Sequence, residues 1–294
     1  MRRNLPPLRS VRPPGRILPL LPALALLGWL FYGALGLSVL RSSGAVPGGD
    51  GQGQMLAAWR AVAGDPQVWR SALVSLWIAG ASTLAAAVLA LGIVLHLRRA
   101  PAGRGVLVAL MRLNLTVPHL VGAAGMLMLW AQSGLAARLA HAMGLVGAPA
   151  SFPALVWDPW AIGIILVYVW KEAPFIALVL LAQSAPADLD REDAARMLGA
   201  SPLQVLRHVT LPALAPGLAA AAAIVFAFAF GAYEVPLMLG ASDPVALPVL
   251  AWQRFTDPDL ALRPQAMVLA LMVAGLSAGA IGVHLGAVRR LREF

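Results

Sequence analysis

The sequence contains no cysteine and only one lysine, Lys171, among 294 residues. Without cysteine, the chain can form neither disulfides nor thiolate metal sites. Because the only lysine lies in Y-V-W-K-E-A-P-F, a phosphate-binding G-x-x-x-x-G-K-[ST] loop is excluded, and the chain cannot bind and hydrolyse ATP by that route. The five histidines show no i, i+4 pair with a carboxylate. We therefore expect no catalytic or metal site.

Long apolar runs dominate the chain. Apolar residues make up 60% of it and charged residues 12%, which is not the composition of a soluble globular domain. Since runs of about 18 or more apolar residues can cross a bilayer as helices, we expect an all-α integral membrane protein with six transmembrane helices. These are predicted at residues 17–40, 69–97, 106–132, 157–182, 213–239 and 264–288. The first run is too long for a signal-peptide core of about 7–15 residues, so it is expected to be retained.

Arginine is distributed unequally between the two ends of these spans. If the N-terminus lies inside, fourteen arginines fall on inner segments, namely Arg2, Arg3, Arg9, Arg12, Arg16, Arg98, Arg99, Arg104, Arg191, Arg196, Arg207, Arg289, Arg290 and Arg292. Six fall on outer segments, namely Arg41, Arg60, Arg70, Arg138, Arg254 and Arg263. The positive-inside rule therefore predicts that both termini and residues 185–212 are cytoplasmic. The net charge of +9 is explained by basic residues at the ends of apolar spans. The sequence shows no alternation of aromatic and basic residues of the kind that would indicate nucleic-acid binding.

The spans divide the chain into five parts. They are a basic cytoplasmic N-terminus (1–16), a first transmembrane helix (17–40), an outer segment (41–68), a five-helix core (69–288) and a cytoplasmic C-terminus (289–294). The outer segment is predicted to hold a short amphipathic helix at about 55–63. Residues 240–263 contain three prolines and three aspartates, so we expect an irregular loop there.

Residues 185–212 form a polar island with clear helix signals. Asp188 or Asp190 is predicted to cap the start of a helix, and Gly199 suits the left-handed position that ends one. Ser201 with Gln204 forms a capping-box pattern that begins a second helix, with Pro202 at its first position, and Pro212 is predicted to open a third. We expect a rigid helix–glycine–helix device in this stretch.

Two adjacent charges, Lys171 and Glu172, lie well inside the fourth predicted span. A charge there costs about 3 kcal/mol unless it is paired or hydrated, and adjacent helix residues point about 100° apart, so the two do not simply pair with each other. Pro174 frees the carbonyl of Trp170 and is expected to kink the helix. Either the charges line a hydrated translocation path, or they form structural ion pairs with another span or subunit.

Two further ionisable residues lie within predicted spans. His119 follows Pro118 in the third span, where it either packs against neighbours or lines a polar path. Glu234 lies near the outer end of the fifth span, beside Pro236, where it either faces an external vestibule or reaches the membrane interface.

Residues 185–212 resemble the EAA loop of ATP-binding-cassette importer permeases of the binding-protein-dependent type I family, which have the MetI-like fold. Because the EAA loop couples such permeases to their ATPase, we call this stretch the coupling loop. That family's pattern is E-A-A, three residues, G, nine residues, I-x-L-P. Here Asp193-Ala194-Ala195 is followed by three residues, Gly199, nine residues, and Val209-Thr210-Leu211-Pro212. Asp193 replaces the usual glutamate, with Glu192 just before it, so either acid could make the family's usual contact. Shorter motifs, such as W-K-E-A-P-F and Y-E-V-P-L-M-L-G, resemble the polyamine, thiamine and ferric-iron branch.

The resemblance implies a permease that docks on a separate ATPase. The implied coupling residues are Glu192, Asp193, Ala194, Ala195, Met197, Leu198, Gly199, Ala200, Leu211 and Pro212, and the candidate path residues are His119, Lys171, Glu172, Pro174 and Glu234. Its implied partners are the ATPase, a second permease subunit, an external substrate-binding protein and the lipid bilayer. ATP and Mg²⁺ belong on the ATPase, and this chain is expected to bind no cofactor. The implied location is the bacterial inner membrane, with residues 41–68 periplasmic.

Two other classes of function are open to the sequence. A secondary transporter could use an ion gradient through Lys171, Glu172 and Glu234, but no internal repeat of the kind common in such folds is found. An integral-membrane enzyme would need polar residues grouped at one depth to form a site, and none is evident.

Overall fold

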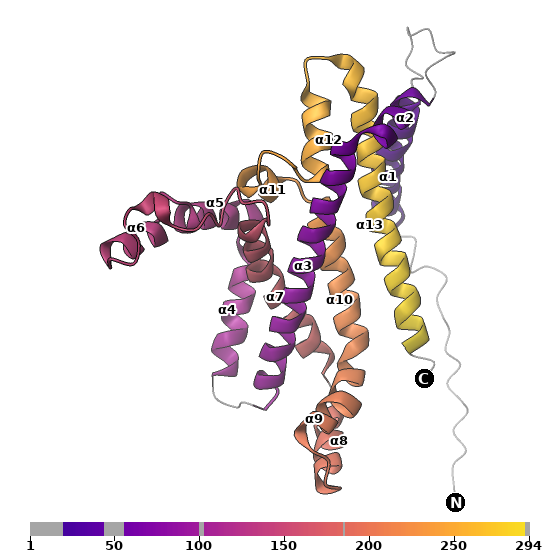
Figure 1. The fold of residues 1–294 in the computed structure, drawn as a ribbon. Helices are drawn as coiled ribbons and strands as arrows, with labels where there is room; N and C mark the ends of the chain where they lie inside the picture. The colour runs from indigo at the N-terminus through magenta and orange to yellow at the C-terminus, as the bar shows by residue number, and fades with distance from the viewer. Residues whose placement is uncertain (1–19, 44–55, 100–102, 185, 292–294) are drawn as a thin grey trace, which may run out of the picture.

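Long helices that run side by side form the body of the protein (Figure 1). The computed structural model describes residues 20–43, 56–99, 103–184 and 186–291, and within these residues the chain contains helices and no β-strand. Six helical segments are long and apolar enough to cross a membrane. The predicted all-α integral membrane fold with six spans is therefore confirmed. The predicted N-terminal part, 1–16, lies outside the described residues.

Three helices form the centre of the body: α3 (Pro66–Leu97), α7 (Ile162–Gln183) and α10 (Leu211–Gly231). Small residues at every third or fourth position of α3, including Ser75, Ala79, Ser82, Ala86 and Ala90, are buried, and such residues let helices approach closely in membranes. At the periphery, α1 (Leu21–Ser42) packs against α13 (Arg263–Leu291). The first and sixth predicted spans correspond to these two outer helices.

The third predicted span, 106–132, is not one helix. α4 (Arg104–Thr116) ends before Val117 and Pro118, both extended, and α5 (His119–Trp130) starts a new helix. Pro118 explains the break, because it lacks an N–H and disfavours a helical conformation at the residue before it. Figure 1 shows α5 leaving α4 sideways and continuing to α6 (Leu135–Ala142). We call α5 and α6 the arm.

The boundaries of the fourth and fifth predicted spans differ from those expected. α7 begins at Ile162 rather than at residue 157, because a turn held by the buried carboxylate of Asp158 precedes it; this carboxylate accepts the backbone N–H groups of Trp160 (3.0 Å) and Ile162 (2.9 Å). The predicted span 213–239 is split at the extended residue Ala232 into α10 and the short α11 (Glu234–Leu239).

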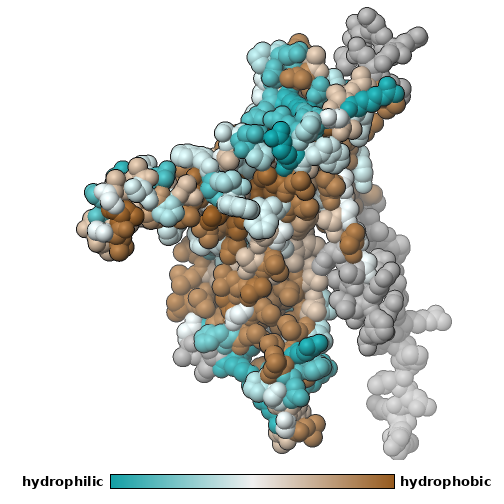
Figure 2. All heavy atoms as spheres, viewed as in Figure 1, coloured by the Kyte–Doolittle hydropathy of each residue, from teal (hydrophilic) through white to brown (hydrophobic). Residues whose placement is uncertain are grey.

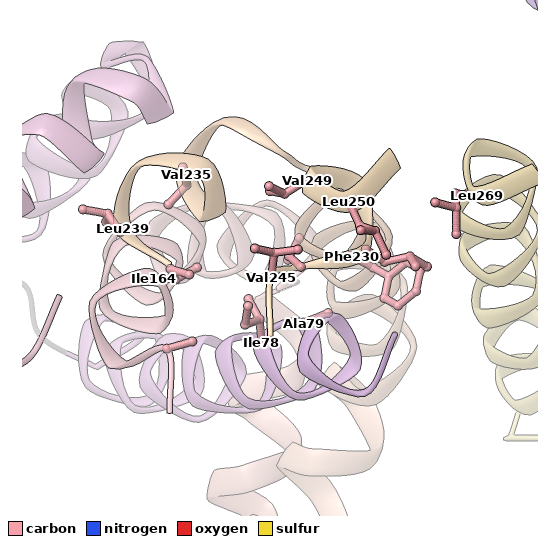
Figure 3. Packing of buried hydrophobic residues seen from close by; sticks show 14 of the residues in the cluster. Ile78, Ala79, Ile164, Phe230, Val235, Leu239, Val245, Val249, Leu250 and Leu269 are labelled. Atoms are coloured by element: carbon pink, nitrogen blue, oxygen red, sulfur yellow. The ribbon is translucent and has the colours of Figure 1, made fainter. Parts of the chain in front are cut away.

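The outer face of the bundle carries two further helices. α2 (Ala57–Gly64) confirms the helix predicted in the outer segment. The irregular loop predicted at 240–263 is wrong, because this stretch contains α12 (Leu247–Thr256). Pro248 lies in the first turn of α12, where a missing N–H costs no helical bond, so it opens the helix instead of breaking it. Val245, Val249 and Leu250 pack in one cluster with Ile78 and Ala79 of α3 (Figure 3).

Candidate coupling element and polar cluster

The coupling loop projects from the inner end of the bundle as two helices joined at Gly199 (Figure 1). Gly199 has φ +87°, as predicted, and its N–H donates to Arg196 O at 2.9 Å. The predicted capping box is also present: Ser201 Oγ accepts from Gln204 N–H, and Gln204 Oε1 accepts from Ser201 N–H. The helix–glycine–helix device, α8 (Pro186–Met197) and α9 (Pro202–Val205), is therefore confirmed.

Two helix boundaries in the coupling loop differ from the prediction. α8 begins at Pro186, so both predicted caps, Asp188 and Asp190, lie inside the helix and not at its cap position. Pro212 does not open a separate helix, because α9 continues through a π-helical turn at 206–210 into α10. In this turn the Leu211 N–H donates to Leu206 O, one residue further back than in an α-helix. α9 and α10 are consequently one continuous helical segment, which connects the coupling loop directly to a central span.

Large apolar side chains at the end of the coupling loop are almost fully exposed. Met197 is 88% exposed, Leu198 90% and Leu203 72%, and Figure 2 shows apolar atoms at this lower tip beyond a polar band. We call these three residues the coupling tip. Of the small residues predicted to allow close docking, Ala194 and Gly199 are exposed, and Ala195 and Ala200 are partly buried. Leu211 is partly buried and Pro212 exposed at the start of α10.

The two adjacent acids of α8 face different surroundings. The Glu192 side chain is only 5% exposed, and its carboxylate accepts bonds from Arg98 Nη1 (2.9 Å), Arg99 Nη2 (2.7 Å) and Thr210 Oγ1 (2.7 Å). The Asp193 side chain is 59% exposed and bonds to Arg99 (3.1 Å) and Arg196 (3.0 Å) at the surface. Glu192 therefore serves contacts inside the chain, and Asp193 is the acid that faces outward.

The arginines keep Glu192 ionised despite its burial. Burial raises the pKa of Glu192, but hydrogen bonds from Arg99 and Thr210, with the charges of Arg98 and Arg99, outweigh it and hold the pKa below its usual value. The same hydrogen bond to Glu192 raises the pKa of Arg99. Arg98 has two further buried nitrogens, Nε and Nη2, that have no partner among the described residues. Glu192 is thus the counter-ion on which the buried guanidinium of Arg98 depends.

Lys171 and Glu172 hold the two sides of the break between α4 and α5. The ammonium of Lys171, which is 2% exposed, donates to Asn114 O (2.6 Å) and Val117 O (2.7 Å), two backbone carbonyls at the break. Asn114 O also accepts the N–H of Val117 at 3.2 Å. The Glu172 carboxylate bonds to His119 Nε2 (2.8 Å), at the first residue of α5. Adjacent positions of α7 thereby bind opposite sides of one backbone break.

The remaining path candidates lie around this cluster. Pro174 is inside α7, one turn beyond Lys171 and Glu172. The His119 ring lies 4.7 Å from the Phe228 ring of α10, and its side chain is 28% exposed. Glu234 opens α11 and is exposed; among the described residues, no hydrogen bond or ion pair joins it to His119, Lys171 or Glu172. The structure therefore groups His119, Lys171 and Glu172 around one backbone break.

The fold defines a class of protein: a multi-pass membrane protein with six candidate spans and a helical element at the inner end of the bundle. Residues 86–292 match the family described as "Binding-protein-dependent transport system inner membrane component". The chain belongs to this family, which confirms the resemblance inferred from the EAA pattern.

Curated relatives include three permeases. The inner membrane ABC transporter permease protein YnjC of Escherichia coli is 28% identical over 74% of this chain and 41% of its own length. A probable molybdenum ABC transporter permease protein, HVO_B0370 of Haloferax volcanii, is 35% identical over 61% of this chain and 60% of its own length. The molybdenum transport system permease protein ModB of Mycobacterium bovis is 30% identical over 72% and 80%. The chain thus spans less than two thirds of the first two relatives.

Solved structures share the fold. A bacterial ABC transporter involved in the import of the acidic polysaccharide alginate aligns with a TM-score of 0.73 at 18% identity, covering 93% of this chain and 94% of that chain. The MetNI methionine ABC transporter, in inward-facing conformations, aligns with a TM-score of 0.51 at 19% identity, covering 77% of this chain and 95% of that chain. At these identities the likeness extends to architecture alone.

Proposed function

We propose that this chain is the membrane-spanning permease subunit of an ATP-driven importer and that it docks on a separate ATPase through the coupling tip. The observation that carries the proposal is the coupling tip itself, because apolar side chains that stand exposed outside the membrane mark a protein contact. The small residues around Gly199 allow a partner surface to approach the backbone. Asp193 supplies a carboxylate for a partner arginine, and the ATPase holds ATP and Mg²⁺.

The translocation path would form between two such permeases, each a copy of this chain or a paralogue. Of the five path candidates, we assign His119 and Glu234 to the path, because their side chains remain accessible. We assign Lys171, Glu172 and Pro174 to the framework, because the two charges are satisfied by contacts that hold α4 and α5 against α7. A passing solute would have to displace these contacts to bind either charge.

The proposed substrate is a small solute delivered by an external binding protein, and the proposed location is the bacterial inner membrane. Relatives of this chain are named as transport proteins for molybdenum, trehalose and Fe(3+). Ferric iron is the cargo that these names share with the polyamine, thiamine and iron branch that the sequence resembles. Nothing in the family or its relatives supports transport driven by an ion gradient.

The test is the substitution Leu198→Ser, assayed by co-purification with the ATPase from the complete complex. Leu198 contacts little of its own chain, so the fold should persist, and loss of an apolar anchor should weaken ATPase binding about tenfold or more. Leu145→Ser is the matched control, because Leu145 is 73% exposed beyond α6 and lies far from the coupling tip. If the Leu198 variant holds the ATPase as tightly as the unmodified chain does, the coupling tip is not the docking site.

A further inference from the structure

α3 is bound by ionic contacts just beyond both of its ends, and the contacts are buried at the inner end and partly buried at the outer end. At the inner end, Arg98 and Arg99 hold Glu192 of α8 at 2.9 and 2.7 Å. At the outer end, Asp65 caps α3 by accepting Gln67 N–H (2.8 Å), and the same carboxylate pairs with Arg254 of α12. Because α3 has 32 residues, its ends lie about 48 Å apart at 1.5 Å per residue. One helix therefore joins two clamps on opposite sides of the membrane.

The outer contacts of α3 extend beyond the Asp65 clamp. Ser75 Oγ accepts the buried Leu247 N–H at 2.7 Å, and Arg70 lies 3.8 Å from Asp243 at the surface. The apolar cluster of Figure 3 seats the same segment on α3, with Val249 among its members. We call residues 243–256 the outer cap. The outer cap is thus held along the outer third of α3 by polar and apolar contacts.

The inner clamp connects α8 to more than α10. Thr210 Oγ1, in the π-helical turn, donates to the same carboxylate oxygen of Glu192 that accepts Arg98. A displacement of α8 therefore acts on α10 through the chain and on α3 through Glu192. Breaking the buried Arg98–Glu192 pair would leave an uncompensated charge, so α8 and the inner end of α3 move together more easily than they separate.

We infer that α3 transmits movement of the coupling helix α8 to the outer cap, with Glu192 as the positioning residue at its inner end and Asp65 at its outer end. The inference rests on the proposed function in taking α8 as the ATPase-facing element. Its consequence is that the ATPase side and the face open to an external binding protein are coupled through α3, in addition to any coupling through α10.

The test is hydrogen–deuterium exchange of the permease alone in lipid nanodiscs. Glu192→Gln removes the charge that holds Arg98 and should accelerate exchange of the α12 amides, on the opposite side of the membrane, about fivefold or more. Asp65→Asn keeps a good helix cap but loses the charge for Arg254, and because α3 links the two ends it should also accelerate exchange in α8. The matched controls, Asp190→Asn on α8 and Asp257→Asn near the outer cap, should change neither.

Two outcomes would overturn the inference. One is faster exchange in α8 with α12 unchanged, which would confine Glu192 to local stability. The other is equal acceleration in α6, at the far end of the arm, which would indicate general loosening of the bundle. If Glu192→Gln does not fold, Glu192→Asp tests the same contact, since it keeps the charge and shortens the side chain by one methylene. Failure of the ATPase to bind the unmodified chain would defeat the proposed function and leave this experiment's result standing.

Discussion

Gly199 offers a sharp test of the coupling loop, because its own backbone restricts what can replace it while its surroundings do not. Its φ is +87°, and a Cβ placed there would meet no heavy atom within 4 Å. An L-residue in the left-handed region costs about 1–2 kcal/mol, so Gly199→Ala should reduce the ratio of the turn to its alternative conformations about 5–30-fold. Gly199→Val should reduce it further because valine is β-branched, and Gly199→Asn least because asparagine tolerates this region.

The apparent Kd of the purified ATPase for the permease in nanodiscs reports this population, since it rises as the docking-competent fraction falls. We expect affinity to decrease in the order glycine, asparagine, alanine, valine at position 199. Gly279→Val is the control, because Gly279 lies in α13 with open space around it and no positive φ. Equal affinities for the asparagine and valine variants, or an equal loss at Gly279, would refute the reasoning that turn geometry controls docking.

Three other features of the structure can be tested separately. The pKa of Glu192 is lowered from 4.5, so the ionised carboxylate contributes fully to stability above that value, and this contribution disappears as pH falls through the lowered pKa. In thermal unfolding measured from pH 7 downward, the unmodified chain should therefore lose more stability than Glu192→Gln does. A double-mutant cycle with His119→Phe and Glu172→Leu should give a coupling of about 0.5–3 kcal/mol in chemical unfolding, and a value near zero would argue against their bond. Pro118→Ala should let Val117 become helical and align the arm with α4, so that spin-label distances from α4 to α6 lengthen in this cysteine-free chain; unchanged distances would show that Pro118 does not cause the break.

The sequence predicts the number of spans well and their continuity poorly. Hydropathy identifies each apolar segment, because a span must bury its backbone in helices whatever its neighbours are. The break at Pro118 is invisible to hydropathy, because both sides of it are apolar. The carbonyls of Asn114 and Val117 at the break bind a residue far along the chain, Lys171. At α12 the sequence instead predicts a break that is absent. Pro248 favours a loop in the pattern of prolines and aspartates, but in the first turn of a helix proline costs no hydrogen bond.

The coupling loop was predictable because its signals are local. Gly199, Ser201 and Gln204 each act on backbone groups within a few residues, so spacing alone identifies the turn and the cap. The difference between Glu192 and Asp193 was not predictable, because it depends on which side of α8 meets Arg98 and Arg99, more than 90 residues earlier in the chain. Two arginines directly after the second span were the one available signal that a carboxylate would be bound there.

The length of α3 explains why ionic clamps can exist at both of its ends. A helix needs about 20 residues to cross the hydrocarbon core, and α3 has 32, so its ends extend beyond the apolar region. Asp65 and Arg98 consequently lie where a charge can be carried at lower cost than in the bilayer centre. The charges inside the membrane, Lys171 and Glu172, follow the other rule: each is bound to the break between α4 and α5. The fold therefore uses its few charges in two ways, to join helices across the bundle at the membrane faces and to support a broken backbone within it.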